Sequence, residues 1–229
     1  MVQYVEESLC IKNYKIYQSK DLYRFTSDAV LLSRFAKGGA AIVADICSGS
    51  GIVGIHYYAL HDDTTEAVTL CELQSELAKM SEASVRLNGL EDTFTVICGR
   101  AQDMTEREKY DLVLCNPPYK KRGSGVASKN RSLDICRKEE EITLDEAVRC
   151  ASKLLKRGGA FCVCNAVDRL QDAFLAFDKH KIYPSRMRLV SAHEGESPYL
   201  FLLEGIKGKR INFTVESQVV NSAKDFSGE

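Results

Sequence analysis

The chain has 229 residues, and its 31 basic and 32 acidic side chains leave a net charge of -1. This length suits one α/β domain with a large core. With almost no net charge, the chain as a whole does not attract nucleic acid, so any such affinity must come from a local basic patch. No apolar run reaches the roughly 18 residues of a membrane helix, so we expect no membrane partner.

Residues 1–26 lie before the regular sequence pattern and predict an N-terminal extension that forms a strand or a hairpin. From 27 to 215, helical periodicity alternates with short β-branched runs, which predicts one domain. Helices are expected at 27–37, 50–60, 74–88, 143–156 and 168–180, and strands at 41–46, 66–72, 93–98, 110–116, 159–166, 183–192 and 198–206. Asn88-Gly89 and Gly158-Gly159 are predicted to end their helices, because they tolerate positive φ. Residues 216–229 form a polar tail, expected to fray from Val219 onward.

This alternation predicts a doubly wound, Rossmann-like α/β fold. Its seven-stranded sheet would be mostly parallel, with the last two strands forming a C-terminal antiparallel hairpin. Ligands bind such sheets beyond the carboxyl ends of the strands. Residues 117–141 break the alternation as a long loop after the fourth strand, which draws attention to that end of the sheet.

The stretch DICSGSGIVG, residues 45–54, contains Gly49-x-Gly51-x-x-Gly54 between a predicted strand and a predicted helix. Glycines let the backbone approach a ligand, and the helix offers free N–H groups and the positive end of its dipole. Glu72 ends the next strand, where a carboxylate can accept hydrogen bonds from both ribose hydroxyls. These features fit NAD and S-adenosylmethionine equally.

Asp45 separates these two ligands by charge. Its carboxylate would repel the pyrophosphate of NAD and would suit the ammonium and sulfonium groups of S-adenosylmethionine. The alternative is that Asp45 only caps the following turn. Gly54 is expected to be the least informative of the three glycines.

Asn116-Pro117-Pro118-Tyr119 ends the fourth predicted strand. Prolines lack an N–H, so the Pro117 carbonyl has no ladder partner. With the Asn116 side chain it can accept both hydrogens of a planar NH2 group, while Tyr119 stacks on the attached ring. Two aligned acceptors favour a pyramidal nitrogen whose lone pair points at a methyl donor. The alternative is an ordinary strand terminator and turn, but the glycine turn with Asp45 and Glu72 favours methyl transfer.

Between Lys120 and Lys138 the predicted loop carries seven basic residues against one acidic residue, Asp134. This basic patch fits phosphate contacts that position an RNA, and the alternative is a solvated loop. A second basic cluster could extend the surface at the last hairpin: Arg186, Arg188, Lys207, Lys209 and Arg210.

The nine cysteines are expected to be reduced, because they fall singly in apolar runs such as those of Cys71, Cys98 and Cys115. Cys162-x-Cys164 lacks the CxxC spacing of a zinc site. The sequence therefore predicts a cytoplasmic protein that holds no metal.

On these motifs the chain resembles the class I S-adenosylmethionine-dependent methyltransferases with an Asn-Pro-Pro-Tyr motif. Within them it is similar to the tRNA(Val) adenine-N(6)-methyltransferase family, on YRFTSDAVLLSRFA at 23–36 and CNPPYKKRGSG at 115–125. The resemblance implies S-adenosylmethionine as cofactor and a tRNA adenine N(6), in the anticodon loop of valine tRNA, as target.

The resemblance also implies roles for individual residues. Asn116, Pro117 and Tyr119 would be catalytic. The cofactor would contact Asp45, Cys47, Ser48, Gly49, Gly51, Glu72, Asp103 and Asn116, and the substrate would contact Pro118, Tyr119, Lys120, Lys121, Arg122 and Arg131. Phe25 to Asp28 would close over the donor, unless Thr26 or Ser27 only caps the helix.

Three features depart from the family's pattern, one of them being that DICRKEEEIT lacks the histidine expected beside Arg137. Cys47 stands where the first glycine of the turn usually lies, which costs little if its φ is negative. Arg100 replaces the acidic residue expected near the cofactor adenine, and Asp103 could substitute for it after a shift of register.

Other functions remain open on the sequence. The motif would accept the NH2 group of a glutamine in a protein equally well. Against this alternative, only some 26 residues precede the predicted core, too few for a sizeable helical domain that binds a protein substrate. The glycine spacing alone also allows an NAD-dependent oxidoreductase. A non-catalytic RNA-binding protein is disfavoured by the intact Asn-Pro-Pro-Tyr motif.

Overall fold

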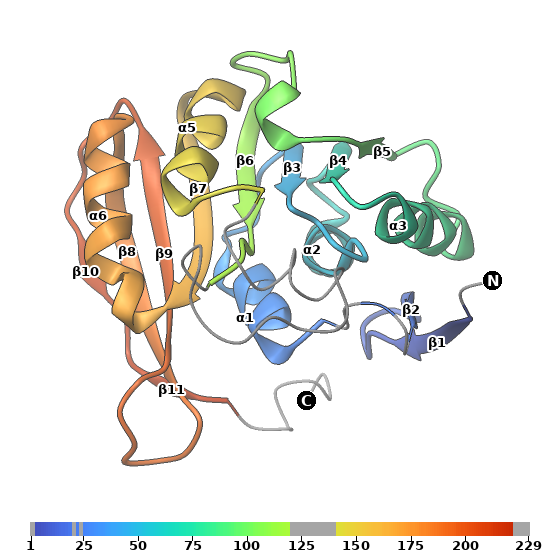
Figure 1. Cartoon of the computed structure of the whole chain (residues 1–229), viewed down its shortest axis with the longest axis horizontal. Helices are drawn as coiled ribbons and strands as arrows, with labels where there is room; N and C mark the ends of the chain where they lie inside the picture. Colours follow the sequence, from blue (N-terminus) through green and yellow to red (C-terminus); the bar gives the residue numbers. More distant parts are fainter. Residues whose placement is uncertain (1–2, 20–21, 23–24, 120–140, 222–229) are drawn as a thin grey trace.

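A computed structural model of the chain describes residues 3–19, 22, 25–119 and 141–221 (Figure 1). A hairpin and a helix open it: β1 (Tyr4–Ser8), β2 (Lys15–Ser19) and α1 (Ser27–Phe35). The first half of the domain follows as β3 (Ile42–Ile46), α2 (Ile52–His61), β4 (Ala67–Glu72), α3 (Ser75–Leu87), β5 (Phe94–Cys98), the 3-10 turn η1 (Ala101–Asp103) and β6 (Tyr110–Cys115). The second half comprises α5 (Leu144–Leu154), β7 (Leu155–Ala166), η2 (Val167–Arg169), α6 (Leu170–Lys179), β8 (Ile182–Ser191), β9 (Leu200–Lys207), β10 (Thr214–Val215) and β11 (Val219–Val220).

The predicted doubly wound sheet is confirmed. Its strand order is β10-β8-β9-β7-β6-β3-β4-β5, with β11 also pairing with β8. Strands β3 to β7 are parallel to one another, whereas β9 runs antiparallel between β7 and β8. The two additional strands, β10 and β11, are two residues long, too short to produce a period-2 pattern in the sequence. After β3 the chain adds β4 and β5 on one side and then β6 and β7 on the other, so the order of strand addition reverses between β3 and β6 and creates the switch point where such sheets bind ligands.

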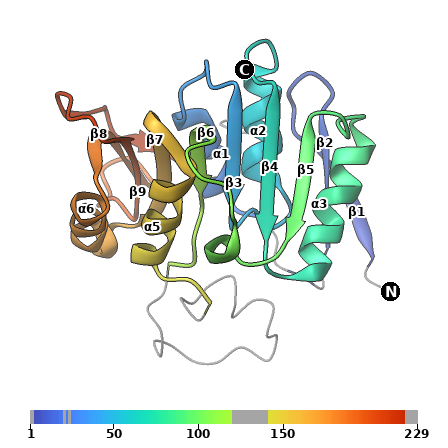
Figure 2. The same cartoon turned by 90° about the horizontal axis from the view of Figure 1, so that it is seen from above.

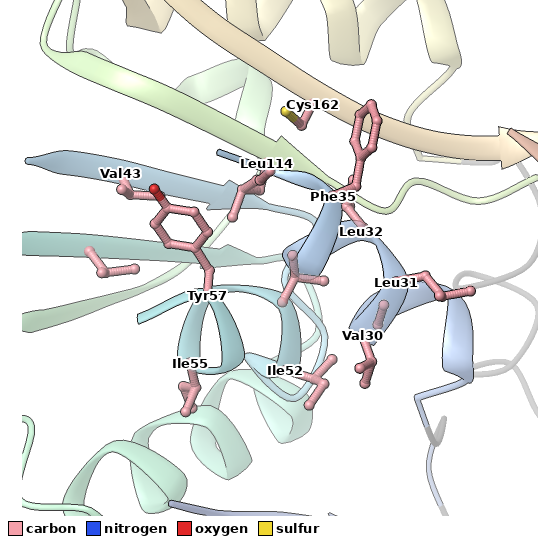
Figure 3. Close-up of a cluster of buried hydrophobic side chains, with 14 of the residues drawn as sticks. Val30, Leu31, Leu32, Phe35, Val43, Ile52, Ile55, Tyr57, Leu114 and Cys162 are labelled. Atoms are coloured by element: carbon pink, nitrogen blue, oxygen red, sulfur yellow. The ribbon is translucent and has the colours of Figure 1, made fainter. Parts of the chain in front are cut away.

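Helices cover both faces of the sheet (Figure 2). Leu114 and Cys162 belong to the cluster shared with α1 and α2 (Figure 3). The next residues in those strands, Cys115 and Val163, belong to the cluster shared with α5 and α6. Successive strand side chains point to opposite faces, so strands buried on both faces read as continuous apolar runs.

The β1–β2 hairpin packs on α3 through hydrogen bonds to its last turns. The N–H of Tyr17 donates to Ser84 Oγ at 2.9 Å, and that of Lys15 donates to Asn88 Oδ1 at 2.9 Å. The predicted extension therefore contains a hairpin that is bound to the domain by backbone hydrogen bonds.

Two local predictions are corrected. Helix α5 ends at Leu154, four residues before Gly158, because Leu155 turns extended to enter β7 fully buried. Gly158, at φ +85°, lies within β7, where the register with β6 shifts. The tail is also ordered further than expected, since Val219 and Val220 pair with β8 and Asn221 donates to Ser27 and Tyr199.

Within the described part of the chain, no helix is long and apolar enough to cross a membrane. Over the same residues, no cluster of three or more His, Cys, Asp or Glu side chains could hold a metal ion.

Candidate active site

A cavity of about 570 Å³ opens at the carboxyl ends of β3, β4 and β6. Ile46 and Cys115 are Cα partners on β3 and β6, so the next residues, Cys47 and Asn116, leave the sheet side by side. The predicted site residues that line the cavity are Cys47, Ser48, Gly49, Glu72, Asn116, Pro117, Pro118 and Tyr119. The switch point thus brings the glycine turn and the Asn-Pro-Pro-Tyr motif to one cavity.

Glu72 holds the glycine turn through its carboxylate. The N–H of Gly49 donates to one oxygen at 2.9 Å and that of Gln74 to the other at 2.8 Å. Burial raises the pKa of Glu72, although these backbone donors partly oppose the shift. The Leu73 N–H is a third backbone donor to this carboxylate, and two carboxylate oxygens offer about four lone pairs, so the carboxylate can still accept from a ligand.

The turn is left-handed at three residues. Gly49 and Gly51 have φ of +57° and +84°, and Cys47 has φ of +63°. The condition under which Cys47 would cost little, a negative φ, is therefore not met. A side chain in this region costs roughly 1–2 kcal/mol, which explains why glycine usually stands there.

Asp45 and Gly54 lie beneath the cavity and are absent from its lining. Asp45 is fully buried, and its Oδ2 accepts from the Gly54 N–H at 2.9 Å. Among the described residues its Oδ1 has no hydrogen-bond partner, and burial above all raises the pKa of Asp45 to about 8.

Gly54 has a packing role beside Asp45. A Cβ there would lie 2.5 Å from Leu70 Cδ2 and 3.3 Å from Asp45 Cβ. Gly54 is therefore needed so that α2 can approach β3 and β4 closely. It serves this packing and does not contact the cavity.

The far end of the cavity is lined by Arg100, Ala101 and Gln102, whereas Asp103 does not line it. Gln102 Nε2 donates to the Glu141 carbonyl at 2.9 Å, and the Arg100 guanidinium pairs with the Glu141 carboxylate. Sequence reasoning missed Gln102 and Glu141, because their contact joins a turn to a segment about 40 residues later and leaves no local pattern.

Asn116 Oδ1 accepts two hydrogen bonds inside the cavity wall. The Tyr119 hydroxyl lies 2.8 Å from it and the Cys164 Sγ lies 3.1 Å from it. The Tyr119 hydroxyl also lies 3.2 Å from Asp28 Oδ2, and the Arg169 guanidinium donates to the Tyr119 carbonyl at 3.2 Å. Tyr119 is thus tied down at both its hydroxyl and its backbone.

Within the Phe25 to Asp28 segment, the Asp28 carboxylate accepts hydrogen bonds from two tyrosine hydroxyls. It is buried, and its Oδ1 also accepts from the Tyr199 hydroxyl at 3.1 Å. Phe25, Thr26 and Asp28 line the cavity, and Thr26 makes no side-chain hydrogen bond as N-cap of α1. This segment therefore does more than start a helix.

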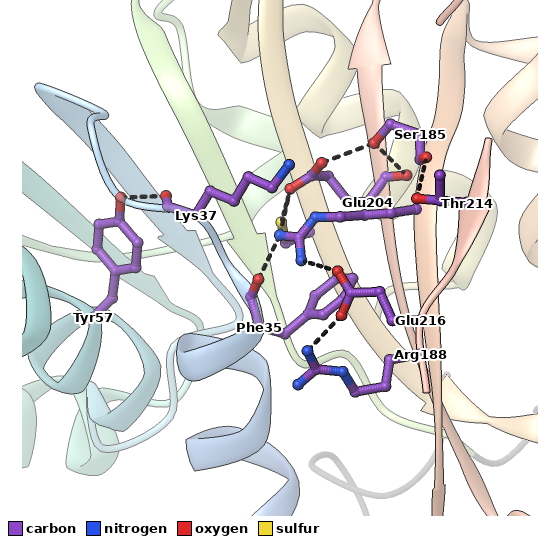
Figure 4. Close-up of polar contacts among 10 residues, drawn as sticks. Phe35, Lys37, Tyr57, Ser185, Arg188, Glu204, Thr214 and Glu216 are labelled. Carbon is purple, nitrogen blue, oxygen red and sulfur yellow. Dashed lines mark hydrogen bonds and ion pairs between the residues drawn. The ribbon is translucent and has the colours of Figure 1, made fainter. Parts of the chain in front are cut away.

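The second basic cluster predicted near the last hairpin is wrong as a phosphate surface. Arg186 is buried, pairs with Glu204 at 2.7 Å and Glu216 at 3.0 Å, and stacks on Phe35 (Figure 4). Arg188 also pairs with Glu216. The guanidinium groups are neutralised within the fold, so they stabilise α1 against β8 and β9.

Two further cations of that cluster are paired, Lys207 with Glu108 and Arg210 with Asp178. The predicted substrate residues Lys120, Lys121, Arg122 and Arg131 lie outside the described residues.

Comparison with known proteins agrees with this geometry. Residues 24–176 match the model of the family described as Methyltransferase small domain. A tRNA1(Val) (adenine(37)-N6)-methyltransferase of Pectobacterium carotovorum is 24% identical over 200 residues, which cover 86% of this chain and 79% of the relative. An enzyme of the same name from Porphyromonas gingivalis W83 is 25% identical over 203 residues, covering 84% and 78%. The crystal structure of a predicted O-methyltransferase from Agrobacterium tumefaciens has 21% identity and a TM-score of 0.66, covering 84% of this chain and 86% of the other.

Proposed function

The chain belongs to the methyltransferase small domain family, and from that premise we propose that it methylates N(6) of an adenine in tRNA. It is a methyltransferase that uses S-adenosylmethionine, which supplies an electrophilic methyl group. The family match decides against the NAD-dependent oxidoreductase. The tRNA and the adenine are the parts that we propose.

The residues of the cavity fit this cofactor. The Glu72 carboxylate is aligned by two backbone N–H groups and retains lone pairs for ribose hydroxyls. The backbone of Ser48 and Gly49 approaches the cavity without a bulky side chain at Gly49, which leaves space for the methionine end. Ala101 and Ile142 give the far end an apolar surface, as an adenine ring requires.

The Asp45 carboxyl group would influence the cofactor only by its charge, without direct contact. Because Asp45 does not line the cavity, we propose that it positions the turn through Gly54. A cationic ligand above it would still favour its ionised form.

The observation that carries the proposal is the position of Asn116 on the wall of the cofactor-sized cavity. Its Oδ1 already accepts hydrogen bonds from two donors, so it can accept one from an exocyclic NH2 group that displaces the Tyr119 hydroxyl. The lone pair of an aromatic amine is delocalised, and acceptors at Asn116 and the Pro117 carbonyl would localise it toward the methyl donor. The freed Tyr119 ring would stack on the base.

A tRNA target is supported by the names of the relatives, which act on adenine 37 of tRNA1(Val). It is also supported by the basic composition of residues 120–138 directly after the motif, because phosphate contacts there would position an RNA. We therefore propose the anticodon loop of valine tRNA as the site.

Purified protein, labelled S-adenosylmethionine and unmodified valine tRNA test the proposal. We expect N(6)-methyladenosine in the digested RNA, and Asn116→Ala should abolish it while binding of S-adenosylhomocysteine survives. Asn165→Ala is the matched control, because Asn165 is fully buried on β7 and does not line the cavity. An active Asn116→Ala enzyme would contradict the mechanism.

The same labelled donor in a cell extract separates the protein alternative. Label that RNase removes supports RNA as substrate. Label that survives RNase on a protein glutamine would replace tRNA by a protein substrate.

A further inference from the structure

Cys162 and Cys164 are alternate residues of β7, and both are fully buried in the same core cluster. Their spacing is not that of a metal site, and the proposed reaction leaves both without a role. Their surroundings differ, however. The thiol of Cys162 faces the Glu204 carboxylate at 3.7 Å, whereas the thiol of Cys164 lies 3.1 Å from Asn116 Oδ1.

The sheet itself places Cys164 beside the motif. Cys115 on β6 is the Cα partner of Val163 on β7, so the residues that follow them, Asn116 and Cys164, are neighbours where β6 ends beside the continuing β7. The contact is therefore set by backbone pairing, which is more rigid than a contact from a loop.

We propose that Cys164 is a positioning residue for the methyl transfer, holding the Asn116 carboxamide with Oδ1 toward the target amine. This inference rests on the proposed function of the cavity. A terminal amide can turn by 180° and exchange its oxygen for its NH2 group, which would present a donor to the substrate amine. The Cys164 thiol donates to the oxygen, and because sulfur is a poorer acceptor from an NH2 group than oxygen is from an S–H group, the thiol opposes that exchange.

Tyr119 cannot hold the amide alone. Its hydroxyl has one proton, and three acceptors lie within reach, Asn116 Oδ1 at 2.8 Å, Asp28 Oδ2 at 3.2 Å and the weakly accepting Cys164 Sγ at 3.4 Å. In the proposed reaction this hydroxyl also leaves Asn116 when the base enters. Cys164 then remains as the donor to Asn116 among the described residues, since burial within β7 keeps it in place.

Burial also keeps the thiol of Cys164 in its proton-bearing form, because it raises the pKa far above the ordinary value. The donor is therefore present throughout the working pH range. Cys164 therefore orients Asn116, and its sulfur does not need to touch the substrate.

The test compares Cys164→Ala, Cys164→Ser and Cys162→Ala in the labelled tRNA assay. Loss of one weak donor should lower kcat of Cys164→Ala about fivefold to tenfold, with the KM for S-adenosylmethionine unchanged. Serine keeps a hydroxyl donor and should recover most of the lost kcat. Cys162→Ala removes an equally buried thiol that contacts Glu204 and not Asn116, and its kcat should stay within twofold of the wild type.

A merely structural role would lower the melting temperature of both alanine variants and leave kcat equal for the two. That result, or a serine variant no better than alanine, overturns the inference while the proposed function stands. If wild-type protein methylates no tRNA, the proposed function fails separately. A crystal structure of Cys164→Ala at atomic resolution, in which the oxygen and nitrogen of the Asn116 amide can be told apart, then decides the inference: a turned or disordered amide supports it, and an amide held as in the wild type overturns it.

Discussion

Replacing Asp45 by asparagine tests the buried carboxyl group that supports the glycine turn. Asp45 is fully buried and accepts the Gly54 N–H at 2.9 Å. Burial above all, with repulsion from Glu72 adding to it, raises its pKa from 3.8 to about 8. The folded chain therefore keeps a proton on Asp45 at pH values where the unfolded chain has lost it.

The sign of the pH dependence follows from this raised pKa. Stability from the Asp45 proton is fully present below the unfolded pKa of 3.8 and is lost as the pH rises through about 8. One pKa unit corresponds to about 1.4 kcal/mol, so going from about pH 5.5 to about pH 7.5 should lower the free energy of unfolding by up to about 3 kcal/mol through Asp45 alone. Asparagine keeps the carbonyl acceptor for Gly54 and cannot titrate, so Asp45→Asn should lose this component.

Urea unfolding of cofactor-free protein at both pH values measures the effect. The stability of Asp45→Asn relative to the wild type should increase between the lower and the higher pH by about 2–3 kcal/mol. Glu66→Gln is the control, because Glu66 is exposed, and its difference from the wild type should be the same at both pH values. A constant difference for Asp45→Asn, within about 0.5 kcal/mol, would refute the reasoning.

Substitutions at three further positions test the cavity and the packing beneath it. Glu72→Gln should weaken S-adenosylhomocysteine binding about tenfold in calorimetry, because one backbone N–H and the ribose lose a carboxylate acceptor. The control Glu76→Gln, exposed on α3, should bind like the wild type. A Glu72→Gln variant with the affinity of the wild type would contradict the ribose role. Gly54→Ala places a Cβ 2.5 Å from Leu70 Cδ2 and should lower the free energy of unfolding by about 1–3 kcal/mol, so an unaltered urea midpoint would show that the helix yields without cost. In the tRNA assay Tyr119→Phe should keep kcat within about threefold of the wild type, because the hydroxyl leaves Asn116 during the reaction. Tyr119→Ala should lower kcat about tenfold, because stacking on the base is lost. A lower kcat for the phenylalanine variant than for the alanine variant would show that the hydroxyl, and not the ring, matters.

The order of the elements could be predicted from the sequence because each buried strand is a short apolar run between helical patterns. Six of the seven predicted strands lie within about two residues of those observed. The seventh, β7, begins at Leu155, four residues earlier than predicted. Leu155 is buried by packing, and helical periodicity alone cannot separate a buried helix end from a buried strand start.

Part of the candidate site could be predicted in the same way. Gly49, Glu72 and Asn116 follow strands whose ends meet at the switch point, so their position on strands was enough to bring them together. The depth of a side chain is not visible in a sequence. Asp45 was expected to face the ligand, but strand alternation turns it into the core beneath the turn.

By itself the sequence determined the fold class, the glycine turn and the acceptor motif, because these depend on residue types at short spacings along the chain. The tertiary structure alone decided which donors surround Asn116. Cys164 comes from 48 residues away, and Asp28 meets Tyr119 across 91 residues. It also decided that Arg186 is neutralised in the core and not displayed to a phosphate. Such contacts arise from strand pairing and helix packing over long separations, and residue spacing carries no record of them.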